Sequence, residues 1–77
     1  MIVTLKASDD VHEPVSHEGQ EFNYVISGVV GVTIKDKEFI LEAGDSIYFN
    51  PSLPHAQRAI GGEAKFLTVI NERMKGK

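Results

Sequence analysis

The chain has 77 residues, no cysteine and a formal net charge of −3. A core of this size supplies on the order of 3–5 kcal/mol of net stability, so such a chain usually needs a metal, a disulfide or a partner subunit. The lack of cysteine excludes disulfides and thiolate metal ligands. A metal held by histidine and carboxylate, or an oligomer, remains.

Charge and hydropathy argue against two further classes of partner. The eight Lys and Arg residues are scattered apart from the C-terminal "RMKGK", whereas a nucleic-acid site needs a clustered basic face. No window approaches the roughly 18 apolar residues of a membrane span, and "MIVTLKASDD" has too short an apolar run for a signal peptide. We therefore expect one cytoplasmic domain over residues 1–77, without nucleic-acid or membrane partners.

The alternation of apolar and polar residues predicts short strands along the whole chain. They are expected at residues 2–6, 15–17, 21–27, 29–35, 38–42, 46–50, 55–60 and 64–71. Between them lie turn signals, among them 7–14, Asp36-Lys37, 43–45, 51–54 and 61–63. About eight strands with turns every 8–12 residues or so are typical of an all-β sandwich or barrel. The structured core should span about 14–71, and the polar tail 72–77 should fray.

The strand at 21–27 carries apolar residues on both of its faces. Successive side chains of a strand point to opposite sides, so Val25 shares a face with Glu21 and Asn23, and the other face carries Phe22, Tyr24 and Ile26. A single-layer barrel would expose one of these faces, and an exposed apolar stripe needs a cover. We expect a homodimer whose interface uses Phe22, Tyr24 and Ile26.

The stretch "SHEGQE" places His17 and Glu21 on either side of Gly19. On one straight strand the two side chains would lie roughly 13 Å apart, at about 3.3 Å per residue, too far to share a metal with bonds near about 2 Å. Glycine readily adopts the positive φ of a tight turn. If Gly19 reverses the chain, His17 and Glu21 face each other and form half of a site.

The stretch "GDSIYFNPSLPHAQ" would supply the other half. Gly44-Asp45 turns the chain into a strand, with the Asp45 carboxylate accepting backbone N–H groups. Pro51 and Pro54 stiffen the next loop, which fixes the position at which His55 begins the following strand.

These two stretches resemble the cupin superfamily over about residues 14–70. Its first motif has two histidines separated by one residue, then a glutamate and, after six more residues, a glycine; its second begins Gly-Asp and reaches a histidine through a prolyl turn. The matching residues are His17, Glu21, Gly28, Gly44, Asp45, Pro54 and His55. The chain looks most like the cupin half of bacterial helix-turn-helix regulators and like stand-alone single-cupin proteins. The resemblance implies a small antiparallel jelly roll or β-barrel, commonly dimeric.

One departure from the family pattern bears on the metal. Val15 stands where the first motif histidine is expected, so the family's four ligands are reduced to His17, Glu21 and His55. Two histidines and a carboxylate can still hold Fe(II), Mn(II), Ni(II) or Zn(II) and leave positions open, with lower affinity. His12 has the opposite parity to His17 and is not expected to replace the missing ligand. The alternative is that the histidines are hydrogen-bonded polar residues lining a small pocket.

Further residues are candidates to contact a ligand. Tyr48, Asn50 and Gln57 could point into the barrel, although polar residues satisfied within the core are the alternative, and Arg58 should face outward. We expect a stand-alone small cupin that binds a divalent transition metal and a small polar metabolite. The alternatives are a metal-free ligand-sensing or regulatory module and a metal-dependent oxygenase or isomerase. Val15 and the lack of a second acid–base candidate at a clear spacing weigh against the enzyme.

Overall fold

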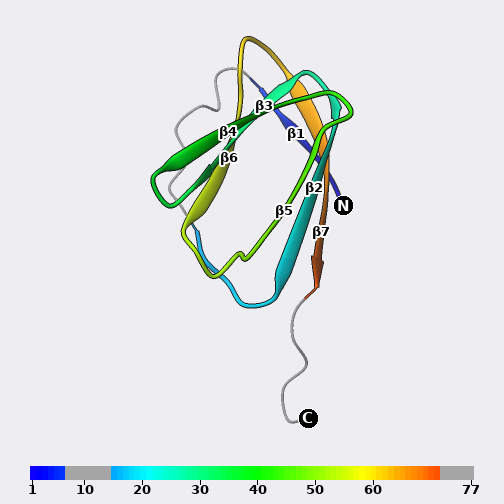
Figure 1. Ribbon diagram of the computed structural model, residues 1–77. Coiled ribbons are helices and arrows are strands. Elements are labelled where there is room, and N and C mark those ends of the chain that lie inside the picture. Colours follow the sequence, from blue (N-terminus) through cyan, green and yellow to red (C-terminus); the bar gives the residue numbers. More distant parts are fainter. Residues whose placement is uncertain (7–14, 72–77) are drawn as a thin grey trace.

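The computed structural model describes residues 1–6 and 15–71, which form two antiparallel sheets. The four-stranded sheet has the order β1-β7-β2-β5, with β1 Ile2–Leu5, β7 Ala64–Asn71, β2 Gln20–Ser27 and β5 Ser46–Phe49. The three-stranded sheet has the order β4-β3-β6, with β4 Lys37–Glu42, β3 Val29–Ile34 and β6 His55–Ala59. Figure 1 shows the two sheets packed against each other, with the three-stranded sheet on the left. The all-β prediction is confirmed.

The expected strands correspond to the seven found, with small differences. Residues 15–17 form no strand; only an isolated bridge joins Val15 to His55. The hairpin after β3 turns at Lys35-Asp36, one residue earlier than expected, because Ile34 pairs with Lys37. Lys35 has a φ of 57°, and left-handed residues are typical of two-residue hairpin loops. The expected turn at 7–14 and the fraying tail at 72–77 fall outside the described residues.

The core lies between the two sheets and follows the two-residue period of the strands. Its buried members are Leu5, Val25, Val30, Val32, Phe49, Ala59, Ala64 and Phe66. The inward face of β2 changes character along its length, because Val25 belongs to this core whereas Glu21 and Asn23, on the same face, are buried and polar. One end of the interior is therefore filled with apolar side chains, and the other holds a polar cluster.

Two turns confirm their expected chemistry. The Asp45 carboxylate accepts a hydrogen bond from the Glu42 N–H at 2.9 Å. Gly28, at the end of β2, has a φ of 79°.

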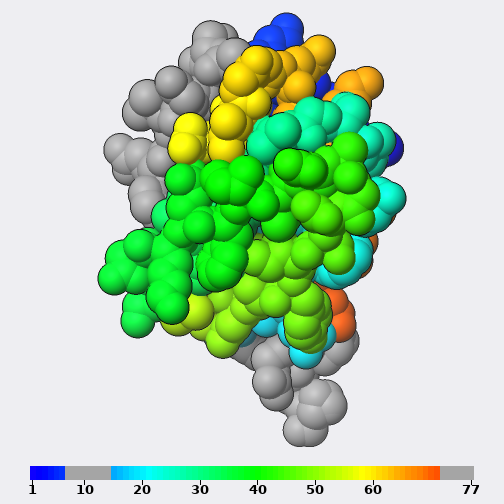
Figure 2. All heavy atoms as spheres, turned by 45° about the horizontal axis from the view of Figure 1, so that its top comes forward, coloured from blue at the N-terminus to red at the C-terminus, as the bar shows by residue number. Residues whose placement is uncertain are grey.

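Strand β4 and the tip of the β3–β4 hairpin, in green, lie on the surface (Figure 2). In the described part of the chain, no helix is long and apolar enough to cross a membrane.

Candidate metal centre

Gly19 turns the chain between His17 and β2, as the spacing predicted. Its φ is 114°, a value that L side chains rarely adopt. The segment before this turn runs beside the prolyl loop, where the His17 N–H donates to the Pro51 carbonyl and Val15 and His55 exchange both backbone hydrogen bonds, each at 3.0 Å. The backbone thereby holds the two histidines side by side.

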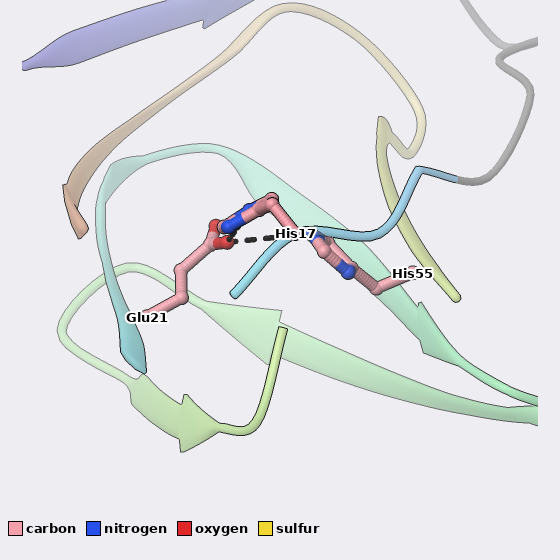
Figure 3. A group of neighbouring side chains, drawn as sticks. All are labelled: His17, Glu21 and His55. Carbon is pink, nitrogen blue, oxygen red and sulfur yellow. Dashed lines mark hydrogen bonds and ion pairs between the residues drawn. The ribbon is translucent and has the colours of Figure 1, made fainter. Parts of the chain in front are cut away.

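The side chains of His17, Glu21 and His55 converge on one point (Figure 3). Oε1 of Glu21 lies 3.2 Å from Nε2 of His17 and 3.3 Å from Nε2 of His55. The two imidazole rings meet edge to face, with 5.2 Å between their centroids. His55 and Glu21 are buried and His17 is half-buried. The three side chains offer one ligand atom each, all within 4.8 Å of one another, a group that could hold a metal ion.

In each imidazole, the contact of Nδ1 with a backbone carbonyl determines whether Nε2, which faces Glu21, carries a proton. Nδ1 of His55 lies 2.9 Å from the Leu53 carbonyl, and Nδ1 of His17 lies 3.2 Å from the Glu18 carbonyl. A carbonyl only accepts, so each Nδ1 carries a proton and each Nε2 of a neutral ring presents a lone pair. Two lone pairs and a carboxylate oxygen then face one another, an arrangement that requires a proton or a cation between them.

The spacing of these atoms fits a transition metal. Bonds of about 2.1 Å and angles between 90° and 109° would separate neighbouring ligand atoms by about 3.0–3.4 Å. The two distances from Glu21 Oε1 to the histidine nitrogens, 3.2 and 3.3 Å, fall in this range. The donor set therefore fits an ion without a large rearrangement of the carboxylate.

The second carboxylate oxygen of Glu21 is held by three donors. Oε2 accepts hydrogen bonds from Asn23 Nδ2 at 3.1 Å, Gln57 Nε2 at 3.2 Å and Thr68 Oγ1 at 3.3 Å. These donors are also linked to each other, since Gln57 donates to Asn23 at 2.9 Å and Asn23 donates to Thr68 at 3.0 Å. A buried carboxylate needs such partners, and here they leave Oε1 facing the histidines. We call Asn23, Gln57 and Thr68 the carboxylate clamp.

Two members of the carboxylate clamp were missed by the sequence analysis. Asn23 lies two residues after Glu21 on the same strand face, a signal that was visible but not used. Thr68 is 47 residues away from Glu21 in the chain and opposes Asn23 only through the register of β2 with β7. Gln57 lies in the expected place, where it contacts Glu21 and Asn23 directly.

The expected inward placement of Tyr48 and Asn50 is wrong. Phe49 fills the inward position of β5, so Tyr48 points outward and is 64% exposed. Asn50 follows the strand, where its Oδ1 accepts the Ser52 N–H at 3.0 Å and stabilises the prolyl loop. Both residues line a separate surface hollow near Gly19.

A cavity of about 290 Å³ contains the three converging side chains. Gln57 and Thr68 of the carboxylate clamp also line it. The remaining described wall is apolar and consists of Val3, Leu5, Val15, Ala56, Phe66 and Ile70. Within the described part of the chain, the site therefore opens into a pocket.

Several solved structures share this fold. Fe(II) HppE in complex with substrate has a TM-score of 0.79 and 30% identity over 90% of this chain. Hydroxypropylphosphonic acid epoxidase from S. wedmorenis in complex with fosfomycin has a TM-score of 0.77 and 29% identity over 91%. An HTH_3 family transcriptional regulator from Vibrio cholerae, at 23% identity over 95% and a TM-score of 0.79, shows the fold alone. The chain covers only 41–42% of these three proteins.

Among curated proteins, none matches this chain. The sequence model of the cupin domain, by contrast, matches residues 1–70. The match includes both halves of the site, His17 with Glu21 and the prolyl loop with His55. The chain therefore belongs to the cupin domain family.

Proposed function

We propose that this protein binds one divalent transition metal ion through His17, Glu21 and His55 and presents it to a small ligand in the cavity. The observation that carries the proposal is the approach of two Nε2 atoms to within 3.2 and 3.3 Å of one carboxylate oxygen. Both rings donate through Nδ1 to backbone carbonyls, which leaves each Nε2 free to bind an ion.

Fe(II) is the first candidate for the ion. Two histidines and one carboxylate with open positions are the usual ligands of non-haem Fe(II), and Mn(II), Ni(II) and Zn(II) also accept imidazole and carboxylate. The structural relatives with Fe(II) and Co(II), at 30–31% identity, support this choice. A bound ion would act as a Lewis acid or redox centre toward a ligand in the cavity. Within the described wall, the only other polar side chains are Gln57 and Thr68, so an oxygenase or isomerase would depend on the metal for its chemistry.

A metal-free ligand-sensing module is the second candidate, and one observation favours it. Among the described residues, no buried side-chain nitrogen or oxygen lacks a hydrogen-bond partner. If the histidines carry a second proton, Nε2–H groups satisfy Oε1 of Glu21 and the cluster is complete without an ion. Val15, which lines the cavity where the family motif has a histidine, also favours this alternative.

Metal titration of chelator-treated protein distinguishes the two candidates. Calorimetry with Ni(II), Zn(II) or, without oxygen, Fe(II) should show one ion per chain. His55→Ala should lower the metal affinity by more than a factor of about 10–100, the loss expected when a group outside the ligand set is removed. Val15→His should tighten binding, because residue 15 lines the same cavity as His17 and would add a fourth ligand. His12→Ala, which removes the remaining histidine, is the control and should bind as the natural chain does.

The pH dependence gives an independent check. Imidazole must be neutral to bind a metal, and metal binding therefore competes with protons, so affinity should fall as the pH is lowered. If the natural chain binds no ion, and Val15→His and His55→Ala change nothing, the metal-binding proposal is wrong and the metal-free module remains.

A further inference from the structure

The cavity wall around the three polar candidate ligands is mostly apolar. Val15 and Ile70 are the most exposed apolar residues of the cavity, at 55% and 43%. Phe66, which is buried, belongs to both the cavity wall and the core. Exposed apolar side chains that line a hollow are the surface that an apolar ligand group would cover.

Among the described residues that line the cavity, the charged and ionisable side chains are the three candidate ligands. None of these described lining residues is Lys or Arg. Within this described wall, a negatively charged group on a ligand has one strong partner, the ion held by Glu21 and the histidines. A second charged or strongly polar group would lose its hydration without a matching partner, which is unfavourable.

The size of the cavity limits the ligand further. A volume of about 290 Å³ corresponds to about ten water molecules at roughly 30 Å³ each. Most drug-sized ligands occupy larger pockets, of about 300–1,000 Å³. A compact molecule of a few carbon atoms fits.

We infer that the ligand has a compact oxygen-donor head, which binds the ion, and a short, uncharged apolar body that packs against Val15, Phe66 and Ile70. This inference rests on the proposed function, since the ion holds the head. It makes the small polar metabolite expected from the sequence an amphipathic one. Val15 then has two effects: it leaves a coordination position open for the head, and it supplies apolar surface for the body.

The test uses 2-hydroxy acids, whose carboxylate and hydroxyl form a constant head. Co(II)-loaded protein is titrated with lactate, 2-hydroxybutyrate, 2-hydroxypentanoate and 2-hydroxyhexanoate, and the visible Co(II) absorption reports binding. A fully buried methylene improves affinity about fourfold, and partial burial in this open pocket should give about twofold. From lactate to 2-hydroxyhexanoate, the affinity should rise about 10- to 60-fold. Glycerate, which has a hydroxyl in place of the terminal methyl of 2-hydroxybutyrate, should bind more weakly.

A matched pair of variants locates the effect in the cavity. Ile70→Asn should flatten the chain-length series while lactate still binds, because the head contacts only the ion. Ile40→Asn is the control: Ile40 is 54% exposed on β4, in the other sheet and outside the cavity, so its series should match the natural one. Circular dichroism checks that both variants fold. If Ile70→Asn does not fold, the chain-length series of the natural chain still tests the inference by itself.

The outcomes separate the two proposals. A Co(II) spectrum together with a rising series supports both. A Co(II) spectrum with a flat series, or with glycerate bound as tightly as 2-hydroxybutyrate, overturns the amphipathic ligand and leaves the metal site standing. Failure of Co(II) to bind at all overturns the proposed function and this inference together.

Discussion

At the scale of single residues, the two oxygens of Glu21 have different surroundings. Oε1 faces the two histidines, whereas Oε2 accepts from the three members of the carboxylate clamp. Glu21 is only 4% exposed, so the orientation of its carboxylate is set by these contacts and not by solvent. A ligand held in this way presents one oxygen to an ion, and its fixed direction reduces the ordering that metal binding requires.

Thr68→Val tests the carboxylate clamp with little change in side-chain volume. The substitution removes the Oγ1–H donor to Glu21 Oε2 and the acceptor for Asn23 Nδ2. We expect metal affinity to fall about 10–100-fold, as for other groups that orient a ligand, measured by competition with a chelator of known affinity. Thr4→Val, on the exposed part of β1, is the control. Equal affinity of the two variants would show that the clamp does not position Glu21.

The residues of the site differ in how far the sequence could identify them. His17, Glu21 and His55 were identified by their match to the two cupin motifs, and one glycine and two prolines marked the turns that could bring them together. Thr68 could not be recognised in this way, since its contact with Glu21 depends on the pairing of β2 with β7, which no local pattern encodes. Tyr48 was misplaced, although its parity relative to the apolar Phe49 indicated the outward face.

At the scale of elements, the junction of β2 with β3 depends on Gly28 for two reasons. Its φ of 79° is left-handed, and a Cβ there would lie 2.6 Å from the Glu63 carbonyl oxygen and 2.8 Å from the Ala64 Cα. Backbone atoms cannot move aside as a flexible side chain can. The sequence analysis identified the turn, but the close approach of β7 became visible only with the sheet assembled.

Gly28→Ala and Gly61→Ala separate these two reasons. Gly61 has a nearly equal φ of 76°, with nothing within 4 Å of the position that a Cβ would take, so its substitution should cost only the left-handed conformation, about 1–2 kcal/mol. Gly28→Ala should cost about 1–3 kcal/mol more for the overlap. A domain this small has about 3–5 kcal/mol in total, so the summed cost for Gly28→Ala, about 2–5 kcal/mol, should remove a large part of its stability. Urea unfolding followed by circular dichroism measures both; equal losses would mean that the close approach is relieved at little cost.

At the scale of the whole molecule, all four strands contribute apolar residues to the outward face of the four-stranded sheet. The pairing registers align Ile2 with Leu67 and Tyr24 in one row. The next row aligns Val69 with Phe22 and Tyr48. Ile2, Tyr24, Tyr48 and Val69 are each at least 40% exposed. Contiguous apolar surface of this kind is typical of an interface. It extends beyond the stripe of Phe22, Tyr24 and Ile26 that the sequence indicated, because β1, β5 and β7 contribute to it.

We expect a second copy of the chain to cover this face. A sheet face can pair with itself about a two-fold axis, the commonest symmetry of soluble oligomers, and Tyr24 lies on a strand flanked by β5 and β7. Light scattering should give the mass of a dimer, and the melting temperature should rise with protein concentration, since association stabilises only the folded chain.

The double variant Tyr24→Asp with Ile26→Asp should give monomers or unfolded chain, because each interface would bury four unpaired carboxylates. Ile40→Asp, at an exposed position on β4 of the other sheet, is the control and should remain dimeric. A double variant that stays a stable, soluble dimer would show that the two copies associate through another surface.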